Sequence, residues 1–496
     1  MPRCRAARAE RYRRRMRDPM KVLVVGGGPA GMSAALHACE LGAQVTLLEA
    51  DQVGGTSLNR GPAPVRTLAR AARLARDWGS WTRFGLEGAP PVPNLAALQG
   101  NAARVARYAH ERKHLAEHLR ASGIDLVEGT GVVRFADDHA IQADDGHVWT
   151  ADRVIIAVGG RAAALPVPGG ELASTYDDLL TLKALPEHAV IIGGADTGCQ
   201  IASILGDFGI RVTVFEATPA LLASADPDVS AGMRSAFEAR GLTIHTGTLV
   251  ERLEKHASRI TVTYRGPNGS DRVIGDAVFA AIGWPANIET LGLERAGVAA
   301  GRGGLVVDEY LRTNVEHIFA AGDVTGHYKL VQTARSEGRI AGRNAVLGPV
   351  QRADYEIIPT GSFTDPEYGQ VGLTEPAAAL NGEVVSAVAR YDDLVRPVVD
   401  GRPDGFCKLL VDRSHRSVVG AHVLGEYSAE IVQVAAAMMA AGMTIEQIAG
   451  LSYAFPTVTE AIGMAAQNIC RQLDLGGFPQ VWSELDVSQE KTARLP

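Results

Sequence analysis

The chain has 496 residues, a length that predicts two to four domains and excludes a single small one. Hydrophobic residues make up 46% and charged residues 21%, proportions that exclude a disordered, collagenous or coiled-coil chain. The net charge of −7 offers no positive field that would recruit nucleic acid or an anionic membrane surface. Glycine is enriched, with 55 residues, as in folds whose tight turns bring the backbone close to ligands.

The N-terminal residues 1–19 are strongly basic and are predicted to form a disordered tail. No secretory signal follows, because residues 22–25 and the glycines after them read as a strand and turn of the fold. No stretch approaches the ~18 to 20 apolar residues needed to cross a membrane. The five cysteines are Cys4, Cys39, Cys199, Cys407 and Cys470. Their wide spacing fits neither a zinc knuckle nor a redox pair, so we expect a cytoplasmic protein and no metal site.

A glycine-rich turn follows the first predicted strand. The apolar run 21–25 leads into Gly26, Gly28 and Gly31, a helical stretch follows, and a second strand ends in Glu49. This order of strand, glycine turn, helix, strand and acid is typical of a dinucleotide-binding fold. The glycines permit a tight turn, the approach of a pyrophosphate and close helix packing, and Glu49 is placed to accept a hydrogen bond from a ribose hydroxyl.

The same pattern recurs in the middle of the chain. The predicted strand 188–192 precedes Gly193 and Gly198, and the next strand ends in Glu216. Ala195 takes the place of the middle glycine, so its methyl group must be tolerated near a pyrophosphate. A carboxylate at position 216 suits a free 2′-hydroxyl and would repel a 2′-phosphate. This second site is therefore predicted to bind NAD in preference to NADP.

The remaining chain contains further predicted strands that end in glycine. They are 153–160 with Gly159, 277–283 with Gly283, and 317–323 with Gly322 and Asp323. From about residue 353 the pattern changes to short β-rich runs followed by a helix over 428–441, which predicts a third, α+β domain.

Taken in this order, the two dinucleotide-binding folds, the acid Asp323 after its strand and the α+β domain resemble the pyridine nucleotide-disulfide oxidoreductases. This is the family of dihydrolipoamide dehydrogenase, glutathione reductase and mercuric reductase. The resemblance implies an α/β fold with two Rossmann-like domains, one for FAD and one for NAD, and a C-terminal α+β domain that forms a homodimer. The expected divisions are a tail over 1–19, an FAD-binding domain over 20–165 and 289–350, an NAD-binding domain over 166–288, a dimerisation domain over 351–477 and a tail over 478–496.

The resemblance also assigns cofactor-binding residues. Gly26, Gly28, Gly31 and Glu49 match the motif that holds the adenosine diphosphate of FAD, and Gly322 and Asp323 match the motif whose acid binds the ribityl and pyrophosphate portion. The other residues assigned to the cofactors are Gly55, Thr56, Gly159 and Gly283, together with Gly193, Gly198 and Glu216 for NAD.

The family's redox motif is altered. Members that reduce disulfides carry GGTCxNxGCxPSK, whereas residues 54–66 here read GGTSLNRGPAPVR, with Ser57 and Pro62 at the two cysteine positions. A hydroxyl has a pKa far above that of a thiol, and proline has no side-chain redox chemistry, so no disulfide forms between these positions.

The family's C-terminal base is altered as well. Where members carry HxHPTxxE, contributed by the partner subunit, residues 453–460 read YAFPTVTE. Phe455 takes the place of the histidine base, Tyr453 takes the place of the other histidine, and the orienting acid remains as Glu460. Phenylalanine cannot titrate, and the reference pKa of tyrosine, near ~10, makes Tyr453 a poor base at neutral pH.

A third change concerns the lysine and glutamate that the family places beside the flavin. The matching residues are Arg66 and Gln200, so the pair gains a permanent cation and loses its carboxylate. A more positive environment favours the anionic reduced flavin. The alternative for Arg66 is a solvated charge on a helix. Trp284 stands where the family has an arginine, and we expect it to serve packing.

These features predict an enzyme that passes electrons from NADH through FAD directly to a small acceptor, of the quinone reductase or diaphorase type. Pro62 and Phe455 would line an apolar slot suited to a planar aromatic acceptor. The candidate catalytic residues are Arg66, Gln200, Ser57, Phe455 and Glu460. One alternative is a flavin-binding sensor or assembly protein without turnover. Another is a disulfide or mercuric reductase that uses non-standard residues, with a thiol among the five cysteines.

Overall fold

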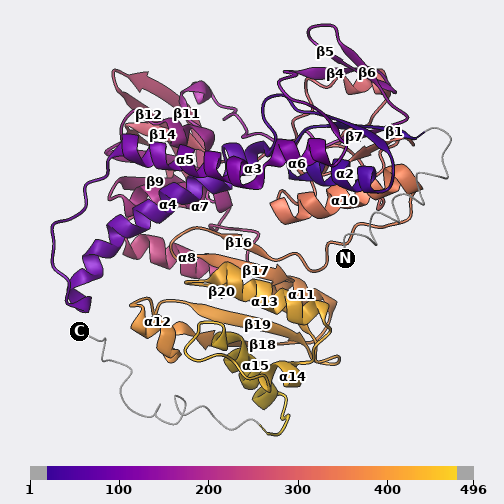
Figure 1. The fold of residues 1–496 in the computed structure, drawn as a ribbon. Helices are drawn as coiled ribbons and strands as arrows, with labels where there is room; N and C mark the ends of the chain where they lie inside the picture. Colours follow the sequence, from indigo (N-terminus) through magenta and orange to yellow (C-terminus); the bar gives the residue numbers. More distant parts are fainter. Residues whose placement is uncertain (1–18, 478–496) are drawn as a thin grey trace. The chain divides into compact units, whose positions relative to one another are not determined.

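The computed structural model describes residues 19–477, which divide into two compact units (Figure 1). Unit 1 contains the chain up to Ala71 together with Val92–Pro186 and Ala277–Asp354, and unit 2 contains Ala72–Pro91, Glu187–Asp276 and the chain from Tyr355 onward. Of the tails predicted over 1–19 and 478–496, residues 1–18 and 478–496 lie outside the described residues. The domain boundaries expected from the sequence remain predictions.

Unit 1 is built on a parallel five-stranded sheet with the order β15-β7-β1-β2-β3. Its strands are β1 (Lys21–Val25), β2 (Gln44–Leu48), β3 (Asp125–Val127), β7 (Arg153–Ile156) and β15 (Ile318–Ala320). Its helices are α2 (Pro29–Glu40), α3 (Gly55–Asn59), the first part of α4 (Pro62–Asp77), α5 (Leu95–Lys113), α6 (Leu115–Ala121), α9 (Leu293–Ala296) and α10 (Val331–Leu347). The short strand β14 (Ala277–Ala280) also belongs to this unit.

Helices α2 and α10 pack closely against each other and against this sheet. A Cβ atom at Gly338 would lie 2.1 Å from the carbonyl oxygen of Ala30, and one at Gly342 would lie 2.5 Å from that of Ala34. The two glycines therefore let the backbone of α10 touch that of α2, whose buried face is made of alanines. This contact holds the first turns of both helices in fixed positions beside the sheet.

A small antiparallel sheet of β4 (Val133–Asp137), β5 (Ala140–Ala143) and β6 (Val148–Thr150) extends unit 1. Phe135 and Ile141 are fully buried and join the core cluster that also contains residues of β1 and β7. The turn between β4 and β5 is closed by the backbone N–H of His139, which donates to Oδ1 of Asp137 at 2.8 Å.

Unit 2 contains a second parallel set of strands, β8 (His188–Ile192), β9 (Arg211–Phe215) and β10 (Thr243–His245), with helices α7 (Asp196–Asp207) and α8 (Pro227–Ala239). An antiparallel meander follows, consisting of β11 (Leu249–His256), β12 (Arg259–Gly266) and β13 (Gly269–Gly275). The strand, turn, helix and strand order of β8, α7 and β9 repeats that of β1, α2 and β2.

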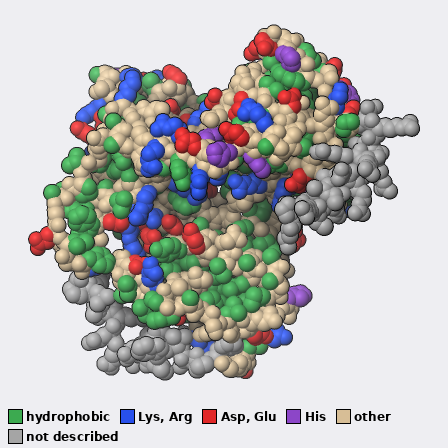
Figure 2. All heavy atoms as spheres, viewed as in Figure 1, with side chains coloured by type: hydrophobic (Ala, Val, Ile, Leu, Met, Phe, Trp, Pro, Cys, Tyr) green, Lys and Arg blue, Asp and Glu red, His purple; other side chains and the backbone are tan. Residues whose placement is uncertain are grey.

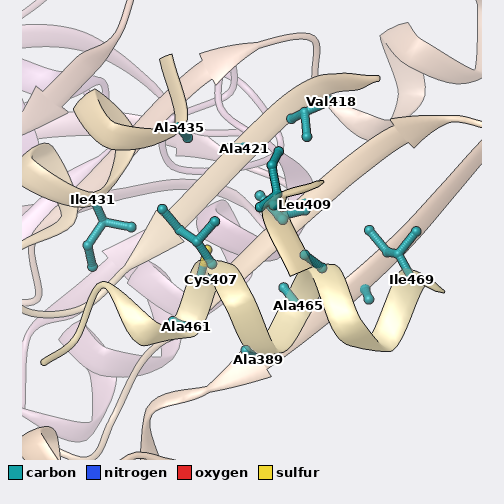
Figure 3. Close-up of a cluster of buried hydrophobic side chains, with 14 of the residues drawn as sticks. Ala389, Cys407, Leu409, Val418, Ala421, Ile431, Ala435, Ala461, Ala465 and Ile469 are labelled. Carbon is teal, nitrogen blue, oxygen red and sulfur yellow. The ribbon is translucent and has the colours of Figure 1, made fainter. Parts of the chain in front are cut away.

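The C-terminal part of unit 2 is an antiparallel five-stranded sheet with the order β16-β17-β20-β19-β18. Its strands are β16 (Thr360–Ser362), β17 (Tyr368–Gly372), β18 (Val384–Arg390), β19 (Phe406–Asp412) and β20 (Val418–Leu424). Its helices are α11 (Glu375–Asn381), α12 (Val395–Val399), α13 (Ser428–Ala440), α14 (Ile445–Ala449) and α15 (Glu460–Gln472). Figure 3 shows the core between this sheet and its helices, in which Cys407 lies among apolar side chains.

Apolar side chains are also exposed on this C-terminal part. They include Leu380, Val388, Val395, Val398, Val399 and Tyr427. Figure 2 shows hydrophobic side chains gathered over the region that Figure 1 draws with β17, β20 and α13. Exposed apolar area of this kind is typical of a surface that a protein partner covers.

A network of ion pairs inside unit 2 joins the end of α4 and the end of α7 to the C-terminal sheet. Asp365 is nearly buried and receives Arg76 and Arg402, and Asp207 pairs with Arg240. Burial raises the pKa of Asp207 to about 6, while the positive charge of Arg240 opposes the shift. Burial raises the pKa of Asp365, but the positive charges of four surrounding guanidinium groups outweigh burial, and the pKa falls to about 2.

Candidate functional site

The first glycine turn closes tightly between β1 and α2. Gly26 has a φ of +105°, and a Cβ atom there would lie 2.3 Å from the carbonyl oxygen of Ala157. A Cβ atom at Gly31 would lie 1.8 Å from the carbonyl oxygen of Gly26. Gly28 is the N-cap of α2 and has no side chain to cap the helix. A Cβ atom at Gly28 would meet its first neighbour, the Cα of Gly55, at 3.8 Å. The first turn of α2 therefore offers free backbone N–H groups to an anion.

Glu49 is held beside this turn by two backbone groups. The N–H of Gly27 donates to Oε2 at 2.6 Å, and the N–H of Asp51 donates to Oε1 at 3.0 Å. Parallel pairing of Val25 with Leu48 brings the residue after β2 next to the turn after β1. Each carboxylate oxygen keeps a further lone pair, which can accept a hydroxyl proton.

The start of α10 meets the start of α2 at Gly322. A Cβ atom at Gly322, whose φ is +81°, would lie 2.9 Å from Cβ of Ala30 and 3.5 Å from Cβ of Ala334. Helix α10 begins without a side-chain cap or an acidic residue in its first turn. The hydroxyl of Thr333 in that turn is buried and, among residues 19–477, has no hydrogen-bond partner. Two helix N-termini and an unsatisfied hydroxyl thus meet at one place.

Two acids flank this meeting point. Glu337 is fully buried on α10 and accepts the N–H of Gly322 through Oε2 at 2.6 Å. Burial raises the pKa of the Asp323 carboxyl, while the charge of Lys329 opposes the shift. Glu337 was not predicted from the sequence. Its position one residue before Gly338, on a helix that packs closely against α2, was the only sequence feature that could have indicated it.

The residues of unit 1 fit FAD. The glycine cradle, the uncapped starts of α2 and α10 and the orphaned Thr333 hydroxyl supply donors for phosphate and carbonyl oxygens. Glu49 supplies an acceptor for a ribose diol. Gly159 and Gly283 lie nearby on linked segments, since the N–H of Asn287 donates to the oxygen of Gly159 at 2.9 Å and the N–H of Ala163 donates to that of Gly283 at 3.0 Å.

Helix α3, which carries part of the segment predicted to correspond to the family's redox motif, lies against the glycine turn. Gly55, with a φ of +61°, approaches Gly28 so closely that a Cβ atom would lie 2.8 Å from its Cα. Ser57 lies on α3 and donates through its hydroxyl to the carbonyl oxygen of Gly54 at 3.2 Å, and Pro62 begins α4. Asn59 anchors α3, accepting from Nε2 of His110 at 2.6 Å.

Arg66 lies near a buried tyrosine that sequence reasoning missed. Burial raises the pKa of Tyr176, and the positive charge of Arg66 opposes this shift. Tyr176 meets Trp284 edge to face, with 6.3 Å between ring centroids. Its neighbour Asp177 has one carboxylate oxygen without a hydrogen-bond partner among the described residues, and burial raises its pKa although Arg60 opposes the shift.

The second glycine turn repeats the geometry of the first within unit 2. Gly193 has a φ of +105°, and Glu216 accepts the N–H of Gly194 at 2.6 Å through Oε2 and that of Thr218 at 2.7 Å through Oε1. Ala195 is the N-cap of α7 and provides no side-chain hydrogen bond. The first turn of α7 differs from that of α2 in one respect, because it carries the exposed acid Asp196.

The residues also fit a nicotinamide dinucleotide, with Glu216 available to a ribose. Gly198 is buried in the first turn of α7. Gln200 lies on the same helix and donates through Nε2 to the hydroxyl of Ser362 at 3.4 Å. It lies in unit 2, whereas Arg66 lies in unit 1.

The predicted C-terminal site residues lie between α14 and α15. Phe455 is 69% exposed, and Glu460 is the first residue of α15. Tyr453 donates to the carbonyl oxygen of Ile448 at 3.1 Å, and burial raises its pKa to about 12. The tyrosine is thus a structural residue with a proton that is hard to remove.

Comparison with known proteins assigns the chain to a family. Residues 20–338 match the pyridine nucleotide-disulphide oxidoreductase family, and residues 358–466 match its dimerisation domain. The chain belongs to the pyridine nucleotide-disulphide oxidoreductases. It is a flavoprotein oxidoreductase that acts on NAD(P)H, and the family resemblance and α/β fold class predicted from the sequence are confirmed. The matched dimerisation domain supports a homodimer.

Several relatives align along most of their length. Mercuric reductase of Streptomyces lividans is 32% identical over 456 residues, covering 90% of this chain and 95% of the relative. Dihydrolipoyl dehydrogenase 3 of Haloarcula marismortui is 30% identical over 462 residues, covering 90% and 96%. The solved structure of the HOCl-induced flavoprotein disulfide reductase RclA from Escherichia coli has a TM-score of 0.80 at 25% identity, covering 90% of this chain and 99% of RclA.

Among residues 19–477, no helix has both the length and the apolar character required to cross a membrane.

Proposed function

We propose that this flavoprotein passes electrons from NADH directly to a small planar acceptor such as a quinone, without a redox disulfide. The observation that carries the proposal is the pair Ser57 and Pro62 at the positions of the family's reactive cysteines. The hydroxyl of Ser57 is engaged with the carbonyl oxygen of Gly54, and neither side chain can form a disulfide. Bound FAD would supply the capacity to take two electrons from NADH and return them to an acceptor.

The cysteines that the structure describes offer no substitute for the missing pair. Burial raises the pKa of Cys199 well above its ordinary value, that of Cys407 to about 12 and that of Cys470 to about 11. Among the described residues neither these three cysteines nor Cys39 forms a disulfide, and a thiol reacts as its thiolate. Disulfide or mercuric reduction, which the names of the relatives suggest, is therefore a weaker candidate for this chain.

The C-terminal segment supports the same conclusion. A disulfide substrate needs a base to accept a thiol proton, and Phe455 cannot do so. Burial raises the pKa of Tyr453 to about 12, and its hydroxyl donates a hydrogen bond to a backbone carbonyl oxygen. An exposed aromatic side chain at position 455 instead offers an apolar surface to an aromatic acceptor.

We propose that Arg66 stabilises negative charge on a bound ligand. Its guanidinium is permanently positive and lies close enough to Tyr176 to oppose the rise of the tyrosine pKa. A fixed cation in this part of unit 1 favours negative charge on a nearby ligand. We further propose Gln200 and Glu460 as site residues on the strength of the family motifs.

NADH is the proposed coenzyme because Glu216 presents a carboxylate at the end of β9. A 2′-phosphate would be repelled there by about 1 kcal/mol in water at ~4 Å, and by more where water is excluded. We place the protein in the cytoplasm, since widely spaced free cysteines suit a reducing compartment.

The decisive experiment is an anaerobic titration of the yellow protein with NADH, followed by a panel of quinone, dye and disulfide acceptors. We expect about one FAD per chain, uptake of two electrons per flavin, no thiolate-to-flavin absorption band and rapid oxidation by quinones. Uptake of four electrons, or faster oxidation by a disulfide than by any quinone, contradicts the proposal. A flavin that NADH does not reduce indicates the sensor alternative.

Two variants locate the acceptor. Phe455→Asp is expected to lower quinone turnover about tenfold or more, because a charge in an apolar acceptor site is costly to desolvate. Leu451→Asp is the matched control, since Leu451 is also an exposed apolar residue of this segment. The double variant Ser57→Cys, Pro62→Cys should not reduce dihydrolipoamide or glutathione efficiently, because the base is still missing and a general base contributes ~10² to 10⁴ in rate.

A further inference from the structure

Three potential metal ligands meet at the surface of unit 1. Asp138 and His139 lie in the turn between β4 and β5, and His317 immediately precedes β15. One ligand atom from each side chain lies within 4.8 Å of those of the other two. The two imidazole rings are stacked, with 3.8 Å between centroids and 1° between planes. Segments almost 180 residues apart thus bring together two imidazoles and a carboxylate.

Each imidazole has one ring nitrogen occupied by a backbone carbonyl. Nδ1 of His139 donates to the oxygen of Ala151 at 2.8 Å, and Nε2 of His317 donates to the oxygen of Asp138 at 2.8 Å. A carbonyl oxygen can only accept a hydrogen bond, so the nitrogen that faces it carries the hydrogen, and these contacts set the tautomer of each neutral ring. The remaining nitrogen then carries a lone pair. Histidines that bind metals are oriented by this kind of hydrogen bond from the other ring nitrogen.

The carboxylate is also available. The neighbouring acid Asp137 closes the turn by accepting the N–H of His139, whereas the side chain of Asp138 is 51% exposed. Its Oδ2 lies 3.8 Å from Nε2 of His317, too far for a hydrogen bond. Asp138 can therefore turn toward a cation without breaking a contact that the fold needs.

We propose that Asp138, His139 and His317 form a binding site for one borderline divalent cation of the Zn²⁺ or Cu²⁺ class. Two imidazoles and one carboxylate suit such ions, while Mg²⁺ and Ca²⁺ prefer sites made of oxygen ligands. A solvent molecule would complete a tetrahedral set. The sequence analysis predicts no metal site, because spacing along the chain reveals nothing about His317 beside the β4–β5 turn.

Binding requires a small rearrangement of the exposed ligands. Zinc holds nitrogen ligands at about 2.0 to 2.1 Å, and the lone pairs of two parallel rings run side by side, so one ring has to turn out of the stack. His139 is on an exposed turn and can rotate once its hydrogen bond to the oxygen of Ala151 is given up, whereas the side chain of His317 is 14% exposed and more firmly held. The cation would fasten the β4–β5 turn to the segment that enters the main sheet.

The test is titration of the untagged FAD-loaded protein with Zn²⁺, followed by isothermal calorimetry, with Mg²⁺ as the comparison ion. We expect one saturable Zn²⁺ site in the micromolar range, and a loss of at least about tenfold in affinity in His139→Ala and in His317→Asn. His415→Ala is the matched control, because His415 pairs with Asp412 through Nδ1 at 2.9 Å but belongs to unit 2. It should leave the affinity unchanged.

Thermal unfolding provides a second measurement. Zn²⁺ should raise the unfolding temperature of the wild type and of His415→Ala but not of His139→Ala, which lies on an exposed turn and keeps the fold. Anomalous scattering at the zinc edge from a soaked crystal should place the ion between the three side chains. The proposal is overturned by the absence of saturable Zn²⁺ binding, by equal affinity in both histidine variants and the wild type, or by an ion located elsewhere.

Discussion

The two dinucleotide-binding folds share one anchor, a glutamate held beside the glycine turn by backbone N–H groups. They differ at the helix that follows the turn. In both, a backbone N–H of the glycine turn donates at 2.6 Å to a glutamate 22 residues later, Gly27 to Glu49 and Gly194 to Glu216. The glutamate also accepts an N–H from two residues further on in both cases. Such agreement shows that strand pairing and local sequence suffice to build this anchor.

The helices after the two turns have different electrostatics. Helix α2 begins with Pro29 and has no acid in its first turn, whereas α7 begins with Asp196. A negative charge at a helix N-terminus is favourable to the helix itself but competes with a bound phosphate. At their other ends, Glu40 is largely exposed and Asp207 is buried. Because only α7 carries an acid in its first turn, we expect the first fold to hold its cofactor tightly and the second to suit a coenzyme that exchanges.

The largest effect is expected from closing the first cradle. Gly31→Ala places a Cβ atom 1.8 Å from the carbonyl oxygen of Gly26, so the turn has to shift, at a cost of about 3 kcal/mol, and the purified protein should lose nearly all its FAD. Gly28→Ala is the control, since a Cβ atom there first meets Gly55 Cα at 3.8 Å and Ala195 occupies the same place in the second fold. It should keep its stability. Flavin absorbance per chain measures the FAD content of each variant, and urea unfolding measures its stability. Equal flavin loss in the two variants would show that the steric fit of the glycine turn does not determine FAD binding.

A pH scan separates the ends of the two helices. Because burial raises the folded-state pKa of Asp207 from 3.8 to about 6, the folded protein holds this proton more tightly than the unfolded chain does. The contribution to stability is therefore greatest below about pH 3.8 and declines as the pH rises to about 6. We expect the unfolding free energy of the wild type, relative to Asp207→Asn, to fall by about 1 to 3 kcal/mol between pH 4 and 7.

The matched control for this scan is Glu40→Gln at the end of α2. Its side chain is 67% exposed, so its difference from the wild type should stay within about 0.5 kcal/mol over the same range. Urea unfolding at a series of pH values gives both differences. A flat difference for Asp207→Asn would mean that Arg240 compensates fully for burial.

The shared anchor can be removed from each fold separately. Glu216→Ala leaves two backbone N–H groups and a ribose hydroxyl without their acceptor, and should raise the KM for NADH about tenfold while relaxing selection against NADPH. Glu49→Ala, its counterpart, should lower FAD content and leave the ratio of NADH to NADPH efficiency unchanged. Steady-state kinetics with both coenzymes after reconstitution with FAD distinguishes the two. A wild-type preference for NADPH would refute the assignment of selectivity to Glu216.

The smallest predicted effect concerns the first residue of each helix. Asp196→Ala removes a like charge from the phosphate end of α7 and should lower the KM for NADH about two- to fivefold. Placing the acid in the other fold, as Pro29→Asp, should weaken FAD binding. If the KM of Asp196→Ala does not fall, the difference between the two folds does not lie in this charge.

Site residues could be predicted from the sequence where the residues that position them lie close by in the chain. Glu49 and Glu216 lie beside the glycine turns, as expected of acids at these strand ends, because two consecutive strands and one helix determine that position. Their role in binding a ribose stays a prediction. The roles assigned to Arg66, Gln200, Phe455 and Glu460 remain predictions. Tyr176 was missed since nothing in its own neighbourhood marks it; it is defined by Arg66 and Trp284, which come from two other segments.

The amino-acid sequence by itself determined the two glycine turns and the family, because each depends on residue types at short spacing. Only the tertiary structure decided that α10 would bring Glu337 and Thr333 to Gly322, that Asp207 would be buried, and that His317 would stack on His139. The contacts at Gly322 and His317 follow from the insertion of a distant strand into one sheet, as β15 is beside β7. Such long-range pairing is selected by burial of the whole core, and no local pattern encodes it.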